Sequence, residues 1–116
     1  MTEVALVALG GAAGSVLRYG VQKAVNTSFP TGTLVVNLIG CFLIGCLWAV
    51  SLRGLNSQLR LLLMAGFCGG FTTFSAFTLE GVQMMTSGRW AVFFLYTISS
   101  VVCGLLATFA GYKIFA

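Results

Sequence analysis

The sequence is poor in charge and contains no histidine. Only 7% of its 116 residues are charged, six Lys/Arg and two Asp/Glu, whereas a soluble domain carries about 25%. Because Glu3 and Glu80 are the only acids, general acid–base catalysis and a metal centre built from side chains lack the groups that they need. These deficits exclude most enzyme classes and predict a non-enzymatic protein.

Apolar residues make up 59% of the chain and form long uncharged runs, among them residues 24–52, 61–79 and 90–112. A membrane-spanning helix needs about 20 mostly apolar residues. We therefore predict a single all-α transmembrane domain over residues 1–116, with helices near 4–25, 32–52, 60–86 and 90–115. The first of these helices contains Arg18, which must snorkel or line an aqueous mouth.

The six cations are divided evenly between the two predicted sides of the membrane. The side of the N-terminus carries Arg53, Arg60 and Lys113. The opposite side carries Arg18, Lys23 and Arg89. Because an excess of Lys/Arg normally decides which side faces the cytoplasm, this division leaves the orientation undetermined. It predicts that both orientations insert and that two copies form an antiparallel (dual-topology) homodimer.

The four cysteines all lie inside apolar runs: Cys41, Cys46, Cys68 and Cys103. They form no C-x-x-C pair, and the chain has no histidine that could complete a zinc site. We therefore interpret them as small apolar packing residues.

The third apolar run is the most informative part of the chain. It carries Gly66, Gly69 and Gly70 near its middle, followed by Thr72 and Thr73. A glycine-rich backbone at this depth can leave the helix, in which case protein, ion or water must satisfy the freed carbonyls. The alternative is that the glycines only allow neighbouring helices to approach closely. The spacing alone does not choose between the two.

Aromatic residues recur in the same run at Phe71, Phe74 and Phe77, a spacing that predicts one shared helix face. They are either packing residues or rings whose positive edges contact an anion. Nearby hydroxyl groups are those of Thr73, Ser75 and Thr78. These hydroxyls can serve as donors or bond back to their own backbone.

Few other polar residues fall inside the apolar runs. Asn37 is either functional or a contact that pairs helices. Tyr96 and Ser100 are four residues apart and face one way on the last helix. Together they indicate a neutral, donor-rich track, which suits an anion better than a cation.

Four strings of residues carry a resemblance to a known family: Gly10–Gly14 with Arg18 and Tyr19, Pro30–Gly40, Gly66–Phe77 with Glu80, and the helix of Tyr96 and Ser100. Together, and in this order, they resemble the CrcB/Fluc-type fluoride channels over essentially the whole chain. The third string is very specific, whereas the first and fourth are weak alone.

The resemblance implies a dual-topology antiparallel homodimer with two pores, embedded in a bacterial-type plasma membrane. Such channels export toxic cytoplasmic fluoride passively. By match to the motifs, the fluoride pore is implied to involve Phe74, Phe77, Asn37, Ser75, Thr33, Tyr96 and Ser100. Arg18 and Glu80 match residues at the pore mouths. The resemblance also implies a break in the third helix, where Gly69 and Thr72 match positions whose backbone carbonyls, from both subunits, hold a structural sodium ion on the two-fold axis.

The sequence departs from the family pattern at Ala76, where a threonine is usual. Two other functions remain open at this point. A dual-topology small multidrug exporter has a similar size, but it depends on a membrane carboxylate in its first helix, where this chain has only Glu3 at the start. A small assembly or scaffold subunit, which predicts no ion flux at all, is the second alternative.

Overall fold

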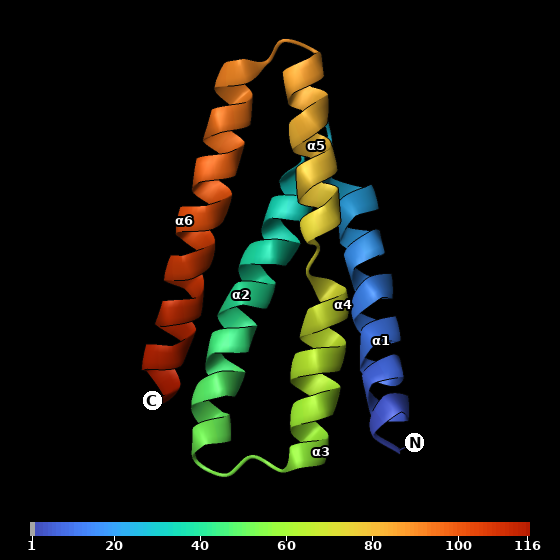
Figure 1. Ribbon diagram of the computed structural model, residues 1–116, viewed down its shortest axis with the longest axis vertical. Coiled ribbons are helices and arrows are strands. Elements are labelled where there is room, and N and C mark those ends of the chain that lie inside the picture. The colour runs from blue at the N-terminus through green and yellow to red at the C-terminus, as the bar shows by residue number, and fades with distance from the viewer. Residues whose placement is uncertain (1) are drawn as a thin grey trace.

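The computed structural model describes residues 2–116, and this part of the chain is helical apart from short connections (Figure 1). The helices, in chain order, are α1 Thr2–Val25, α2 Thr31–Leu52, α3 Ser57–Arg60, the π-helical segment η1 Leu61–Cys68, α4 Gly69–Phe71, α5 Phe74–Thr86 and α6 Trp90–Phe115. Four segments are long and apolar enough to cross a membrane, with Ser57–Thr86 as the third. The predicted all-α architecture with four membrane helices is therefore confirmed.

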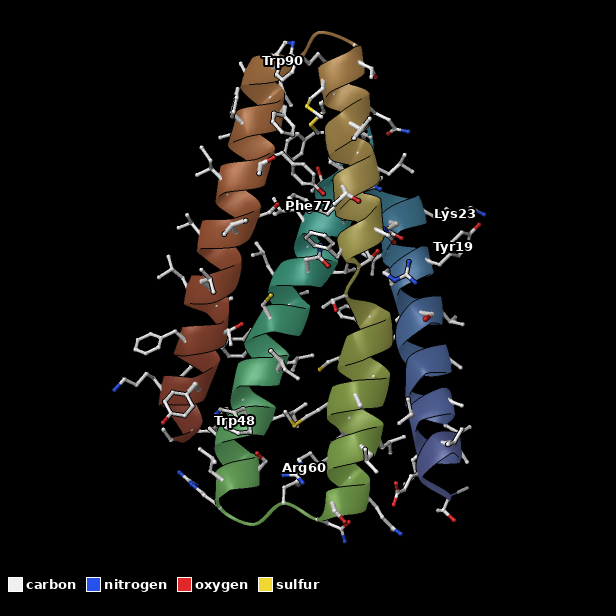
Figure 2. The ribbon with its side chains drawn as sticks, in the orientation of Figure 1. Tyr19, Lys23, Trp48, Arg60, Phe77 and Trp90 are labelled. Atoms are coloured by element: carbon white, nitrogen blue, oxygen red, sulfur yellow. The ribbon has the colours of Figure 1, made fainter. Side chains whose placement is uncertain are left out.

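Both termini and the connection between α2 and α3 lie at one end of the molecule (Figure 1). The α5–α6 connection lies at the other end, and the α1–α2 connection lies behind α5, short of that end (Figure 1). The molecule extends 48 Å along its longest axis, which exceeds the roughly 30 Å of a hydrocarbon core. Trp48 and Trp90 lie near opposite ends (Figure 2) and are about half exposed, as expected of residues at the two membrane interfaces.

Glycine residues bring α1 into backbone contact with the third membrane segment. A Cβ atom added to Gly14 would lie 2.7 Å from the backbone nitrogen of Phe71, and one added to Gly66 would lie 3.0 Å from the Cα of Gly10. Gly70 faces α1 in the same way. For Gly66 and Gly70 the structure therefore supports close helix approach, the second of the two interpretations of the glycine-rich run.

A second close contact joins α2 to α6. A Cβ atom added to Gly111 would lie 3.0 Å from the backbone nitrogen of Cys46, and the Thr108 hydroxyl donates to the Cys41 carbonyl at 2.9 Å. The four cysteines are free thiols, and two of them, Cys41 and Cys46, lie in this contact. This placement agrees with the interpretation of these two cysteines as packing residues.

The third membrane segment is broken at two threonines rather than at its glycines. Thr72 and Thr73 are extended, with φ/ψ of −89°/158° and −148°/117°, whereas Gly69 is still helical at −61°/−38°. A break in the third helix, as the resemblance implies, is therefore confirmed, and Gly69 itself remains helical just before it. The helix ends where side chains can replace backbone partners, because hydrocarbon offers none.

Candidate ion pathway

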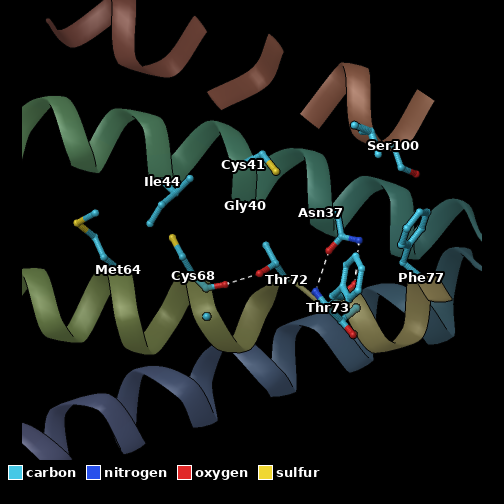
Figure 3. A pocket seen from close by; sticks show the side chains of 13 residues that line it. Asn37, Gly40, Cys41, Ile44, Met64, Cys68, Thr72, Thr73, Phe77 and Ser100 are labelled. Atoms are coloured by element: carbon cyan, nitrogen blue, oxygen red, sulfur yellow. Dashed lines mark hydrogen bonds between the residues drawn. The ribbon is translucent and has the colours of Figure 1, made fainter. Parts of the chain in front are cut away.

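A cavity of about 410 Å³ lies beside the break, bounded by α2, η1, α4, α5 and α6 (Figure 3). Six of the predicted site residues line it: Asn37, Gly69, Thr72, Phe74, Phe77 and Ser100. The tertiary structure thus brings together residues from four helical elements. The other predicted residues, described below, lie outside this lining.

Asn37 holds the break in place. Its Nδ2 donates to the Thr73 carbonyl at 3.1 Å, and its Oδ1 accepts from the Thr73 N–H at 2.8 Å (Figure 3). A single side-chain amide therefore satisfies both backbone groups of an extended residue at membrane depth, as the lack of water there requires. The Nδ2 atom carries a second hydrogen, which leaves Asn37 with one further donor.

The break diverts two backbone donors from the carbonyls that they would reach in a continuous helix. The Thr73 N–H pairs with Asn37 instead of the Gly69 carbonyl, and the Ala76 N–H pairs with the Thr73 hydroxyl at 3.1 Å instead of the Thr72 carbonyl. The carbonyls of Gly69 and Thr72 thus lose their regular helical donors. Oxygen atoms of this kind fit a hard cation.

Side chains offer no comparable cation site. Within residues 2–116, no group of three or more His, Cys, Asp or Glu residues lies close enough together to hold a metal ion. Gly69 itself lines the cavity, and a Cβ atom at this position would meet only the Met64 carbonyl, at 4.0 Å. A cation at the break therefore depends on backbone oxygens.

The three phenylalanines do not share one helix face, so that prediction is wrong. Phe71 ends α4, is 6% exposed and stacks on Phe67 with ring centroids 5.5 Å apart. Phe74 begins α5 and is 77% exposed. The extended residues between them rotate the chain, and the helical period does not continue across them.

Phe77 links the cavity to the aromatic part of α6. Its ring centroid lies 5.8 Å from that of Phe74 and 5.2 Å from that of Tyr96. The Tyr96 ring in turn packs edge-on against Phe29 at 5.4 Å. Aromatic side chains thus extend from the open side of the cavity to the buried Tyr96, whose side chain is fully covered.

Glu80 organises a polar cluster beyond Phe77. Its carboxyl group accepts from the Thr33 hydroxyl at 2.8 Å and from the Tyr96 hydroxyl at 2.9 Å. The Gln22 amide donates to the Thr33 hydroxyl at 3.0 Å. The sequence pattern did not single out Gln22, whose only signal is that it is a polar residue near the end of an apolar helix. Glu80 also borders a second cavity of about 210 Å³, which includes Arg89.

The serine residues differ in what they bind. Within the described chain, the Ser100 hydroxyl oxygen is buried and has no hydrogen-bond partner. Buried polar groups are nearly always paired, so an unpaired hydroxyl in the cavity lining indicates a hydrogen-bond partner that enters the cavity. Ser75 is exposed, and its hydroxyl lies 3.4 Å from that of Thr73.

Arg18 lies inside α1, and its side chain contacts the third membrane segment rather than the end of its own helix. Its Nε donates to the Gly70 carbonyl at 2.9 Å, and α1 continues to Val25, roughly 10 Å further along the axis. Arg18 lines neither cavity. The side chain of Arg18 thus joins α1 to the end of α4.

The fold and the site define a four-helix membrane protein with a partly polar cavity beside a broken helix. The family described as "CrcB-like protein, Camphor Resistance (CrcB)" matches residues 5–112. The chain belongs to this family, as the motifs predicted.

Relatives match over nearly the full length. A protein of Phocaeicola vulgatus is 45% identical over 116 residues, with 96% of each chain covered. One of Leptospira interrogans is 47% identical over 112 residues, covering 91% of this chain and 88% of the relative. One of Rhizobium etli is 45% identical over 120 residues, covering 98% and 96%. All three are named fluoride-specific ion channel FluC, an ion channel rather than an enzyme, which agrees with the predicted non-enzymatic character.

Proposed function

We propose that this protein is a fluoride-selective channel through which cytoplasmic fluoride leaves the cell passively, relieving its toxicity. The observation that carries the proposal is the near-full-length identity of 45–47% to relatives named fluoride-specific ion channels. The geometry of the cavity supports it, because neutral donors and aromatic rings line the cavity. We place the protein in a bacterial-type plasma membrane as a multi-pass protein.

The cavity suits a small anion that must exchange its water for other donors. Asn37 retains one N–H and Ser100 an unpartnered hydroxyl, and both residues line the cavity. The rings of Phe74 and Phe77 border the same space, and the edges of aromatic rings carry partial positive charge. In this proposal the two polar groups replace part of the hydration shell, and the ring edges complete it.

The path continues toward the second cavity. Phe77 contacts Tyr96, and the hydroxyls of Tyr96 and Thr33 both bind Glu80. Ser75, whose exposed hydroxyl lies beside the break, supplies a further donor. We assign these hydroxyls to the polar track and Glu80 to a pore mouth. Arg18, which donates to the Gly70 carbonyl beside the break, contributes positive potential to the pathway.

We further propose that two copies assemble antiparallel, with two pores per dimer. The cavity is open on one side in the single chain, and Phe74, which lines it, is 77% exposed. A second copy covers this side and packs against the ring, and van der Waals packing of this kind is what stabilises helix contacts in lipid. The even division of Lys/Arg between the two sides supports insertion in both orientations.

A sodium ion at the two-fold axis is the proposed cofactor. The carbonyls of Gly69 and Thr72 would hold it, two from each subunit, and the diverted donors at the break support this assignment. The bound ion would supply a fixed positive charge near the anion path. Asn37 keeps the extended backbone in place through its two hydrogen bonds to Thr73.

Anion efflux from liposomes tests the proposal. Purified protein is reconstituted with internal potassium fluoride or potassium chloride, and release is followed with ion-selective electrodes after valinomycin is added. We expect rapid fluoride release and little chloride release. Equal release of both anions contradicts a selective channel, uptake of a cationic drug driven by a pH gradient points to the exporter, and no flux points to a scaffold.

A further inference from the structure

The interaction between Arg18 and Gly70 occupies a defined position in the broken helix. In a continuous helix the Gly70 carbonyl would accept from the N–H of Phe74, which here lies beyond the extended residues Thr72 and Thr73. The Nε of Arg18, 52 residues earlier in the chain, donates to this carbonyl at 2.9 Å. A side chain of α1 thus replaces the donor that the break removed.

The carbonyls of Gly69 and Thr72, the proposed sodium ligands, are not occupied in this way. The Thr73 and Ala76 N–H groups are taken by side chains, and no side-chain donor from α1 is directed at Gly69 or Thr72 in the described structure. Arg18 therefore occupies the Gly70 carbonyl, one of the two carbonyls that lie in sequence between the proposed sodium ligands. A guanidinium cannot lose its charge in a protein, so a change of pH does not remove this donor from the Gly70 carbonyl.

The glycine contact between α1 and the third segment places Arg18 where it can do this. Gly14 packs against the backbone of Phe71, and Gly11 packs against Gly70. Arg18 follows Gly14 by four residues and so lies one turn further on the same face of α1. The close approach of the backbones turns the side chain toward the carboxyl end of α4, where a cation also interacts favourably with the helix dipole.

We propose that Arg18 is a positioning residue for the cation site at the break. It fixes the end of α4, so that the peptide groups of Gly69 and Thr72 keep their orientation, and it withholds the Gly70 carbonyl from the cation. This inference rests on the proposed function, because it deepens the role of the proposed sodium site. It differs from a role at a pore mouth, which requires only the charge of Arg18.

Sodium-dependent thermal stability of the purified full-length protein tests the inference without relying on fluoride flux. The Tm is measured in detergent while sodium replaces N-methylglucamine at constant ionic strength. We expect the wild-type Tm to rise with sodium. In Arg18→Met the sodium concentration at half of this rise should increase at least about tenfold, the usual effect of losing a residue that orients metal ligands.

Two further variants sharpen the test. Arg18→Lys keeps the charge but not the planar guanidinium, so its half-point should also shift toward higher sodium, and it serves alone if Arg18→Met does not fold. Lys23→Met removes an exposed cation from the last turn of the same helix, and its sodium dependence should match wild type.

Wild-type sodium dependence in both Arg18 variants overturns the inference, even if their flux falls, because a loss of flux alone indicates a pore-mouth charge. If the wild-type protein releases fluoride but its Tm does not depend on sodium, the inference is also overturned, whereas the proposed channel function is supported. A sodium-dependent Tm with the expected shift, in a protein that releases no fluoride, supports the role of Arg18 and overturns the channel instead.

Discussion

The side-chain amide of Asn37 pairs with both backbone groups of Thr73, at 2.8 Å and 3.1 Å. The two residues are 36 positions apart, on α2 and at the break of the third membrane segment. This pairing makes an extended residue tolerable inside an apolar bundle. The same pairing takes the Thr73 N–H away from the Gly69 carbonyl. The Asn37 amide therefore stabilises the break and also leaves the Gly69 carbonyl without its helical donor.

Replacement of Asn37 by alanine should destabilise the protein and abolish efflux. Two buried backbone groups lose their partners, each at about 1–3 kcal/mol, and the cavity loses a donor. The Tm in detergent and fluoride efflux from liposomes measure the two effects. Asn56→Ala is the matched control: this amide caps α3 at an exposed site, so the variant should lose only about 1 kcal/mol and retain efflux. Normal efflux in Asn37→Ala contradicts its place in the pathway.

Isoleucine at position 74 or 77 should slow fluoride efflux by about fivefold or more, because a contact with a ring edge is worth about 1 kcal/mol. Isoleucine keeps the apolar volume of the side chain but has no positive ring edge. Phe94→Ile, at an exposed position on α6, provides the control and should conduct normally. If Phe74→Ile and Phe77→Ile both release fluoride at the wild-type rate, the rings have no role in conduction.

Replacement of the two adjacent serines on α6 should affect efflux differently. Ser100→Ala removes a hydroxyl that lacks a partner in the described structure, so we expect slower efflux with an unchanged or slightly higher Tm. Ser99 donates back to the Leu95 carbonyl of its own helix, and Ser99→Ala should leave efflux unchanged. Efflux that is equally slow in both variants indicates a general disturbance of α6 rather than a site at Ser100.

Tyr96→Phe should cost about 1.5–3 kcal/mol of stability, the typical worth of a hydrogen bond to a carboxylate. The ring keeps its contacts with Phe29 and Phe77, so the loss reports mainly the bond to Glu80. Glu80→Gln provides the second arm of a double-mutant cycle read by thermal or denaturant unfolding. Additive losses contradict direct coupling, since residues in one hydrogen-bond network are expected to couple.

The dual-topology assembly can be tested with single cysteines in a chain whose four native cysteines are replaced by alanine. Ser57 lies at the α2–α3 end and Ser87 at the α5–α6 end. If both orientations insert, a membrane-impermeant thiol reagent should label about half of the Ser57→Cys chains and about half of the Ser87→Cys chains from outside intact cells. Complete labelling of one variant and none of the other indicates a single orientation.

The sequence by itself determined the four membrane helices, because spans of about 20 apolar residues have no other stable form in lipid. The observed helices agree closely with the predicted 4–25, 32–52, 60–86 and 90–115. The motif strings also determined the family, since they match it along nearly the whole chain. The free thiols of Cys41 and Cys46 likewise lie in a helix contact, as their apolar surroundings predicted.

Only the tertiary structure decided where the third helix breaks and which side chains meet there. The local pattern left the role of the glycines open; Gly66 and Gly70 allow close approach to α1, and the break falls at Thr72 and Thr73. A break needs partners for its backbone groups, and Asn37 and Arg18 provide them from helices far away in sequence. Periodicity describes a single helix, so it cannot reveal a hydrogen bond between helices.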